Sequence, residues 1–249
     1  MILYPNAKIN IGLNVVEKRI DGYHEISSVF YPVKTLFDIL EIIPADVFSF
    51  VSSGMPIPEG PNICIKAFKL LERDFNIDKV SIHLHKKIPI GAGLGGGSAD
   101  GAFTLIALNL LFKLGLSDFQ LKQYALQLGA DCPFFIDNTP KYVTGIGEKM
   151  LPINLDLSAY DIRFIFPNIH ISTAQAYNSI VPVKPKDDLF DLISKPADSW
   201  RSLVKNDFEP FAFRCHQELK ELKEKLYLEA AVYASMSGSG SALYGLFER

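Results

Sequence analysis

The sequence predicts an α+β fold with two domains, and three features of the chain indicate it. Several segments alternate apolar and polar residues with a period of two, which is typical of half-buried strands. Separate apolar segments of helical length follow serine, asparagine or glycine signals for a helix start. The composition changes after Pro152, so we expect an N-terminal domain over residues 1–154 and a C-terminal domain over residues 155–249.

The first strand is expected around residues 9–15, where apolar residues occupy every second position. Lys8 and Asn10 then point to the same face of this strand, away from the core. An Asp-Gly turn signal places Tyr23 and His24 just before the next strand. The other expected strands cover residues 25–33, 36–43, 46–51, 80–85, 160–166 and 242–247.

The helices are expected from their start signals and their apolar faces. Asn62 stands at an N-cap position ahead of a helix that ends near Phe75. Residues 99–114 are apolar nearly all round, which predicts a buried helix, and Ser117 caps the helix that follows it. The C-terminal part is expected to hold short helices and one longer helix over residues 211–227.

Composition and charge exclude several classes of function. The formal net charge is -3 and the basic residues are scattered, so we expect no nucleic-acid partner. The apolar runs are too short for a membrane span, and the first residues lack the pattern of a signal peptide. The three cysteines have no metal-type spacing, which favours reduced thiols in a cytoplasmic protein. The sequence leaves monomer and homodimer open.

A glycine-rich segment between a predicted strand and a predicted helix is the strongest functional signal. Glycine occupies five of the seven positions from 91 to 97. Such a loop lets backbone N–H groups approach a ligand closely, and the helix start behind it adds to an anion cradle. We therefore expect a phosphate-binding loop made of Pro89, Ile90, Gly91, Ala92, Gly93, Leu94, Gly95, Gly96, Gly97, Ser98 and Ala99.

Three well-known phosphate motifs do not fit this loop. The spacing Gly-x-Gly-x-x-Gly occurs, but another helix follows where a dinucleotide-binding unit needs a strand. Ser98 stands where a P-loop needs lysine. The strand and catalytic-loop motifs of protein kinases are absent from the sequence.

Three segments resemble the motifs of the GHMP kinases, in the order that this family has them. They are Pro5–Leu13, the glycine-rich loop Pro89–Ser98, and a second glycine loop Met236–Ser241 that contains Gly238 and Gly240. The resemblance implies an ATP-dependent small-molecule kinase. It also implies an N-terminal domain of the ribosomal protein S5 domain 2-like type, a ferredoxin-like C-terminal domain and an active site between them.

Further segments narrow the resemblance. Arg19–Glu25, Gly129–Phe135 and Asn206–Glu209 are similar to the 4-diphosphocytidyl-2-C-methyl-D-erythritol kinases of the non-mevalonate isoprenoid route. This similarity implies that ATP phosphorylates the 2-hydroxyl of a substrate that carries a cytidine diphosphate group, giving ADP and the 2-phosphate. The chain departs from the family at Gly101, where alanine is expected, and residues 182–205 are compact for the family.

The resemblance assigns the chemistry to two residues. Asp131 is expected to accept the hydroxyl proton, and Lys8 to keep that carboxylate ionised and to offset charge on the transferring phosphoryl group. The alternatives are a helix-capping aspartate and a solvated strand lysine. Asn10 shares the face of Lys8 and is expected to bind substrate or to orient Lys8.

The substrate and nucleotide contacts are expected at Tyr23, His24, Tyr177 and Asn62. Tyr23 and His24 fit recognition of the cytosine by stacking and by hydrogen bonds, and the family places a ring against the base at Tyr177. The resemblance places an adenine contact at Asn62, which an N-cap alone would also explain. Mg²⁺ is expected to accompany ATP, with unknown protein ligands and Ser98 as a weak candidate.

Two alternatives stay open. Another GHMP kinase, of the homoserine or mevalonate type, would not depend on cytidine, and the Tyr23-His24 pair speaks against it. An inactive ligand-binding member would have lost Lys8, Asp131 or the glycine loop, and the sequence retains all three.

Overall fold

The computed structural model describes residues 1–58 and 60–249. The chain forms two compact units that interleave along the sequence. The first unit comprises residues 1–8, 32–90 and 95–139, and the second comprises 9–31, 91–94 and 140–249. The boundary at residue 154, which divides the chain only once, stays a prediction. In the described part of the chain, no helix has the length and apolar character that crossing a membrane requires.

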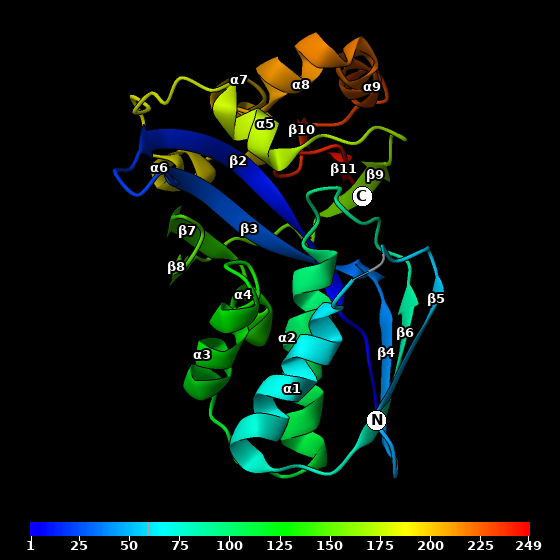
Figure 1. The fold of residues 1–249 in the computed structure, drawn as a ribbon. Coiled ribbons are helices and arrows are strands. Elements are labelled where there is room, and N and C mark those ends of the chain that lie inside the picture. Colours follow the sequence, from blue (N-terminus) through cyan, green and yellow to red (C-terminus); the bar gives the residue numbers. More distant parts are fainter. Residues whose placement is uncertain (59) are drawn as a thin grey trace. The chain divides into compact units, whose positions relative to one another are not determined.

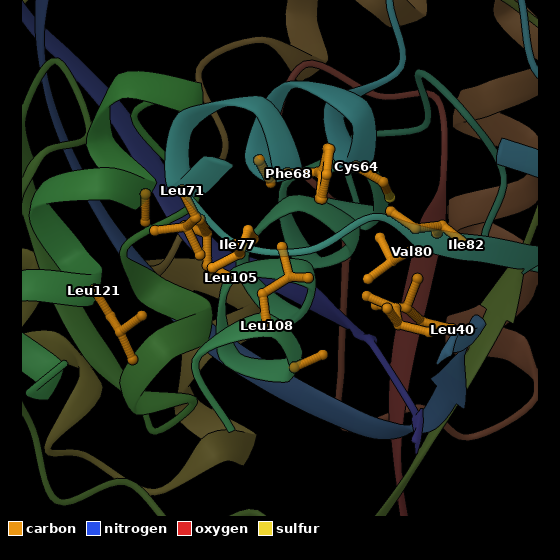
Figure 2. Packing of buried hydrophobic residues seen from close by; sticks show 14 of the residues in the cluster. Leu40, Cys64, Phe68, Leu71, Ile77, Val80, Ile82, Leu105, Leu108 and Leu121 are labelled. Carbon is orange, nitrogen blue, oxygen red and sulfur yellow. The ribbon is translucent and has the colours of Figure 1, made fainter. Parts of the chain in front are cut away.

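The first unit combines a four-stranded sheet with helices. The sheet has the order β1 (Ile2–Leu3), β4 (Ile39–Pro44), β6 (Val80–Lys86), β5 (Ser49–Gly54), and only β5 and β6 are parallel. The helices are α1 (Ile63–Phe75), α2 (Gly96–Leu111), α3 (Asp118–Leu128) and α4 (Phe134–Asp137). Figure 1 shows α1 and α2 side by side next to the sheet. Their facing side chains form one core, in which Leu40, Phe68 and Leu105 are buried (Figure 2).

Local signals explain where these helices begin. The Asn62 side chain accepts a 2.8 Å hydrogen bond from the backbone N–H of Cys64, which confirms the N-cap of α1. Ser117 and Gln120 form a capping box at the start of α3. Helix α2 is buried as expected, but it begins at Gly96, three residues before the predicted start. The last glycines of the loop therefore form the first helical turn.

The glycine at position 101 has a packing reason. A Cβ atom at Gly101 would lie 2.8 Å from Cγ1 of Ile63, closer than real Cβ contacts come. Helices α1 and α2 pack against each other. A side chain at position 101 would collide with Ile63, so glycine permits their close approach.

The second unit contains two sheets. One has the order β2 (Asn6–Lys18), β3 (His24–Phe37), β7 (Lys141–Gly145), β8 (Lys149–Pro152), and the first residues of β2 and the last of β3 belong to the first unit. The other has the order β10 (Tyr233–Met236), β11 (Leu243–Glu248), β9 (Tyr160–Ile165). The helical segments are α5 (Thr173–Asn178), α6 (Leu189–Ile193), η1 (Ala197–Ser199), α7 (Trp200–Leu203), α8 (Glu209–Cys215) and α9 (Gln217–Leu228).

One predicted element of this unit is wrong. The expected helix over residues 211–227 is two helices, α8 and α9. His216 between them has φ -139° and ψ 89°, which is outside the helical region. Helical periodicity continues across the break because both helices bury residues of one core, including Ala212 and Leu219. Strands β7, β8 and β10 of this unit, and β1 of the first unit, have no counterpart among the predicted elements.

Candidate active site

Lys8 and Asp131 form an ion pair in the first unit. Lys8 lies on β2, and its Nζ is 3.5 Å from Oδ2 of Asp131. The lysine side chain is 5% exposed and the aspartate side chain 34% exposed. Burial lowers the pKa of Lys8, while the charge and hydrogen bond of Asp131 act in the opposite direction. The pair thus offers a carboxylate that is open to a ligand and a cation behind it.

The face of β2 that carries Lys8 and Asn10 is not solvated, contrary to the expectation from strand alternation. Both residues are buried, along with their apolar neighbours from Ala7 to Leu13. The physical reason for Lys8 is that Gly95 lies directly against its side chain, because a Cβ atom on that glycine would come within 3.0 Å of Cγ of Lys8. This geometry excludes the alternative of a solvated strand lysine.

A short turn presents Asp131. Backbone hydrogen bonds from Cys132 N–H to the Gly129 carbonyl and from Phe134 N–H to the Asp131 carbonyl define the turn. Phe134 and Phe135 follow at 0% exposure and anchor it in the core. Helix α4 then begins after Pro133, and its described N-cap has no side-chain hydrogen bond. Asp131 therefore faces Lys8 and does not cap this helix.

The N-terminus of α2 lies beside this pair. Gly95 is the N-cap of α2, with a left-handed φ of +67°. A Cβ atom on Gly95 would lie 3.0 Å from both Cγ of Lys8 and Cζ of Phe135. Only glycine fits the conformation and the space together. The N–H groups of the first turn of α2, which have no partner within the helix, therefore start near a buried lysine, which is a suitable place for an anion.

In the second unit, the remaining part of the glycine-rich loop packs on the second glycine loop. The Ser237 hydroxyl donates a 2.8 Å hydrogen bond to the Gly93 carbonyl, and Ala242 N–H donates one of 3.2 Å to Ala92. A Cβ atom on Gly93 would lie 1.9 Å from the Ser237 carbonyl oxygen. Gly238 and Gly240 have φ values of +56° and +93°. The two loops touch through their backbones, which requires glycine at the contact.

The segment Asn206–Glu209 supports the second glycine loop. The Asn206 amide donates hydrogen bonds of 2.8 Å to the carbonyls of Met236 and Gly238. The Glu209 carboxylate accepts one of 2.9 Å from Met236 N–H and pairs with Lys223. Sequence analysis assigned no individual role to these residues, although the segment is similar to a family motif. The signal that was available is that three of its four residues are polar.

Asn10 is a structural residue in the second unit. Its side-chain amide donates a 2.8 Å hydrogen bond to the Ser28 hydroxyl, which in turn donates one of 2.6 Å to the Gly12 carbonyl. Its backbone N–H donates to Ser237 at 3.2 Å. These bonds connect β2, β3 and the second glycine loop. A substrate contact at Asn10 stays a prediction.

The structure brings together two of the three rings expected to bind cytosine. His24 and Tyr177 stack at 5.0 Å between ring centroids, with 25° between their planes. Tyr177 also packs edge-on against Phe208 at 4.8 Å. Burial lowers the pKa of His24, and nearby Lys18 acts in the same direction, so the neutral imidazole is favoured. Tyr23 is 61% exposed in the preceding turn, and its backbone N–H is bound to Asp21.

The described residues contain no group of three or more His, Cys, Asp or Glu side chains that could hold a metal ion. Ser98, the weak candidate, lies in the first turn of α2 and hydrogen-bonds the Cys132 thiol. Burial raises the pKa of that thiol to about 12, so Cys132 is a neutral packing residue beside Asp131.

Comparison with known proteins identifies the family. Residues 62–138 match the GHMP kinases N terminal domain, and residues 188–249 match the GHMP kinases C terminal domain. A 4-diphosphocytidyl-2-C-methyl-D-erythritol kinase of Azobacteroides pseudotrichonymphae is 49% identical over 100% of this chain and 94% of its own. The enzyme of that name from Bacteroides thetaiotaomicron is 48% identical over 100% of this chain and 92% of its own.

Solved structures agree. The crystal structure of 4-(cytidine 5'-diphospho)-2C-methyl-D-erythritol kinase matches with a TM-score of 0.85 and 34% identity, over 99% of this chain and 90% of that one. The mevalonate kinase of Methanococcus jannaschii matches with a TM-score of 0.68 and 15% identity, over 100% of this chain and 90% of that one, which is a likeness of fold alone. The chain therefore belongs to the GHMP kinases and, among them, to the 4-diphosphocytidyl-2-C-methyl-D-erythritol kinases.

Proposed function

We infer that this chain transfers a phosphoryl group from ATP to the 2-hydroxyl of 4-diphosphocytidyl-2-C-methyl-D-erythritol. The relatives that carry this activity in their names match 100% of this chain, over 94% and 92% of their own lengths. The observation that carries the inference in the structure is the Lys8–Asp131 pair, which lies beside the glycine N-cap of a helix. This combination has the parts that phosphoryl transfer requires: a group that receives a proton, a cation and an anion cradle.

In the proposed reaction, Asp131 accepts the proton as the O–H bond of the substrate hydroxyl breaks. The freed oxygen forms a bond to the γ-phosphorus of ATP, the bond from that phosphorus to the β,γ-bridging oxygen breaks, and ADP leaves. Lys8 holds Asp131 in place through their ion pair and offsets negative charge during the transfer. The backbone N–H groups of the glycine-rich loop and the first turn of α2 hold the phosphates.

We propose that ATP binds as its Mg²⁺ complex. Mg²⁺ prefers oxygen ligands, keeps several waters and needs few protein groups when phosphates bind it. The Asp131 carboxylate and the Ser98 hydroxyl are the candidate oxygens that this chain would offer the ion. When bound, the ion would neutralise charge on the phosphates.

We propose that His24 and Tyr177 bind the cytosine. Aromatic side chains hold unstacked bases by stacking, which contributes about 1–3 kcal/mol per base. At 5.0 Å between centroids the two rings stack on each other. To admit a base between them, the two rings would have to move to about 7 Å between centroids. Without that movement, the base would stack on the outer face of one ring. A neutral His24 can also accept or donate one hydrogen bond at the base edge.

The test is an ADP-release assay with Mg²⁺-ATP and four acceptors: 4-diphosphocytidyl-2-C-methyl-D-erythritol, methylerythritol 4-phosphate, mevalonate and homoserine. We expect turnover only with the cytidylated compound. Turnover with mevalonate or homoserine instead would retain the kinase and reject the cytidine site. ATP binding without turnover on any of the four would favour an inactive ligand-binding member.

A further inference from the structure

A second lysine–carboxylate cluster lies buried in the first unit. Lys86, at the end of β6, places its Nζ 2.5 Å from Oδ2 of Asp38 and 2.7 Å from Oδ2 of Asp100. Asp38 lies between β3 and β4, and Asp100 lies on α2. The side chains of Lys86, Asp38 and Asp100 are 3%, 0% and 3% exposed. The cluster is therefore closed to ligands, and a direct role in chemistry is excluded.

This cluster joins the two ends of the glycine-rich loop. On the strand side, Oδ1 of Asp38 accepts hydrogen bonds from the backbone N–H groups of Lys87 at 2.6 Å and Ile88 at 2.8 Å. On the helix side, a Cβ atom on Gly96 would lie 3.0 Å from Nζ of Lys86 and 2.8 Å from Cγ2 of Ile88. Asp100 then attaches the second turn of α2 to the same ammonium group.

The charges in the cluster are unequal. One ammonium group faces two carboxyl groups, and burying a net charge is costly. Asp38 accepts three hydrogen bonds, one from Lys86 and two from backbone N–H groups. Oδ1 of Asp100 has no hydrogen-bond partner, a condition that no other buried side-chain oxygen or nitrogen shares in the part of the chain that the structure describes. An unsatisfied buried polar atom is destabilising, so its presence needs a reason.

We propose that Asp100 is a positioning residue for ATP binding: through Lys86, it fixes the start of α2 against the end of β6 and thereby holds both ends of the phosphate-binding loop in place. The proposal rests on the function proposed above, in which this loop binds the phosphates. An apolar residue at position 100 would pack in the core without an unpaired polar atom. It would, however, leave Lys86 bound only to Asp38 and not to helix α2. The helix that directs its N–H groups at the phosphates would then lose its polar attachment to the strand.

The protonation state of Asp100 supplies an independent readout. Burial raises its pKa to about 8, with Asp38 acting in the same direction and Lys86 against it. The groups that face Asp100 are Lys86, Asp38 and Cys64 of α1, and burial raises the pKa of the Cys64 thiol to about 12, which keeps it neutral. Because the folded pKa of Asp100 is above its unfolded value of 3.8, the stability that its proton contributes is fully present below pH 3.8. It is lost as the pH rises from that value through about 8, where the folded carboxyl releases its proton.

The experiment compares Asp100→Asn and Asp100→Ala in the full-length enzyme, with KM measured separately for ATP and for the acceptor. Asparagine mimics the protonated acid and still accepts a hydrogen bond from Lys86, so we expect a KM for ATP within about threefold of the unmodified enzyme. Alanine removes the acceptor, and we expect the KM for ATP to rise about tenfold, with the acceptor KM unchanged. Between about pH 4 and pH 8, the free energy of unfolding of the unmodified enzyme should fall relative to that of Asp100→Asn, because asparagine does not titrate.

A matched control separates positioning from stability. Leu121→Ala removes a buried side chain from the same core, on α3, and should lower the free energy of unfolding without changing the KM for ATP. The proposal would be overturned if the KM for ATP rose equally in Asp100→Ala and Leu121→Ala. It would also be overturned if the KM for ATP rose equally in Asp100→Asn and Asp100→Ala.

Gly95→Ala tests the underlying assumption, because it strains a left-handed position in the loop itself. If that change leaves the KM for ATP unaltered, the loop is not the ATP site and the proposed function fails. If Gly95→Ala raises the KM for ATP and Asp100→Ala does not, only the inference about Asp100 fails.

Discussion

Two buried lysines of the first unit meet carboxylates in different ways. Lys8 pairs with the half-open Asp131, whereas Lys86 lies between the closed Asp38 and Asp100. Burial lowers the pKa of Lys8 because Asp131 offsets it only in part. Burial also acts to lower the pKa of Lys86, but Asp100 and Asp38 together raise it above the usual value. The accessibility of the acid distinguishes a pair that can take part in chemistry from a cluster that can only hold structure.

The largest expected effect is on the open pair. Asp131→Asn keeps the shape and removes the proton acceptor, so kcat should fall about 10²–10⁴-fold, while ATP binding measured by calorimetry stays within about threefold. Unchanged turnover would show that Asp131 does not accept the proton. The Lys8–Asp131 pair would then have no more part in the chemistry than the closed Lys86 cluster.

The next comparison exchanges each lysine for methionine. Lys86→Met leaves two buried carboxyl groups without a cation and should cost about 3–5 kcal/mol of unfolding free energy in urea titration. Lys8→Met leaves an acid that water can reach, so it should cost less than about 1 kcal/mol and lower kcat instead. A larger loss of stability in Lys8→Met than in Lys86→Met would contradict the distinction.

The smallest expected effect lies at the stacked rings of the second unit. Tyr177→Ala should raise the KM for the cytidylated acceptor about tenfold, because stacking on a base contributes about 1–3 kcal/mol. The KM for ATP should not change. Tyr23→Ala, at the exposed ring, is the matched comparison and should have the smaller effect. A larger rise in the acceptor KM for Tyr23→Ala than for Tyr177→Ala would assign the cytosine contact to Tyr23 instead.

Local signals predicted those parts of the site that depend on local geometry. The cap at Asn62, the capping box at Ser117 and the run of glycines before a buried helix each follow from neighbouring residues. The start of α2 was predicted three residues late, because glycine disfavours helix interiors in water. Here Gly95 and Gly96 are required by close packing against Lys8 and Ile88, which the sequence does not reveal.

The parts that depend on distant residues were missed. Asp38, Lys86 and Asp100 are separated by 48 and 14 positions along the chain, and nothing local connects them. The available signal was Asp100 itself, a charged residue in a helix that is apolar nearly all round. The break at His216 was missed because the helices on both sides of it bury residues of one core, so the apolar pattern continues without interruption.

The backbone contact between Gly93 and Ser237 bears on how modular this enzyme is. Gly93 and Ala92 of the glycine-rich loop accept hydrogen bonds from Ser237 and Ala242, which lie near the C-terminus. A cut at residue 154 would separate these partners and would also remove β9, β10 and β11 from the chain that carries the loop. A fragment that keeps this loop in its observed contacts must therefore include the last segment of the sequence, supplied either in the same chain or as a complementing peptide.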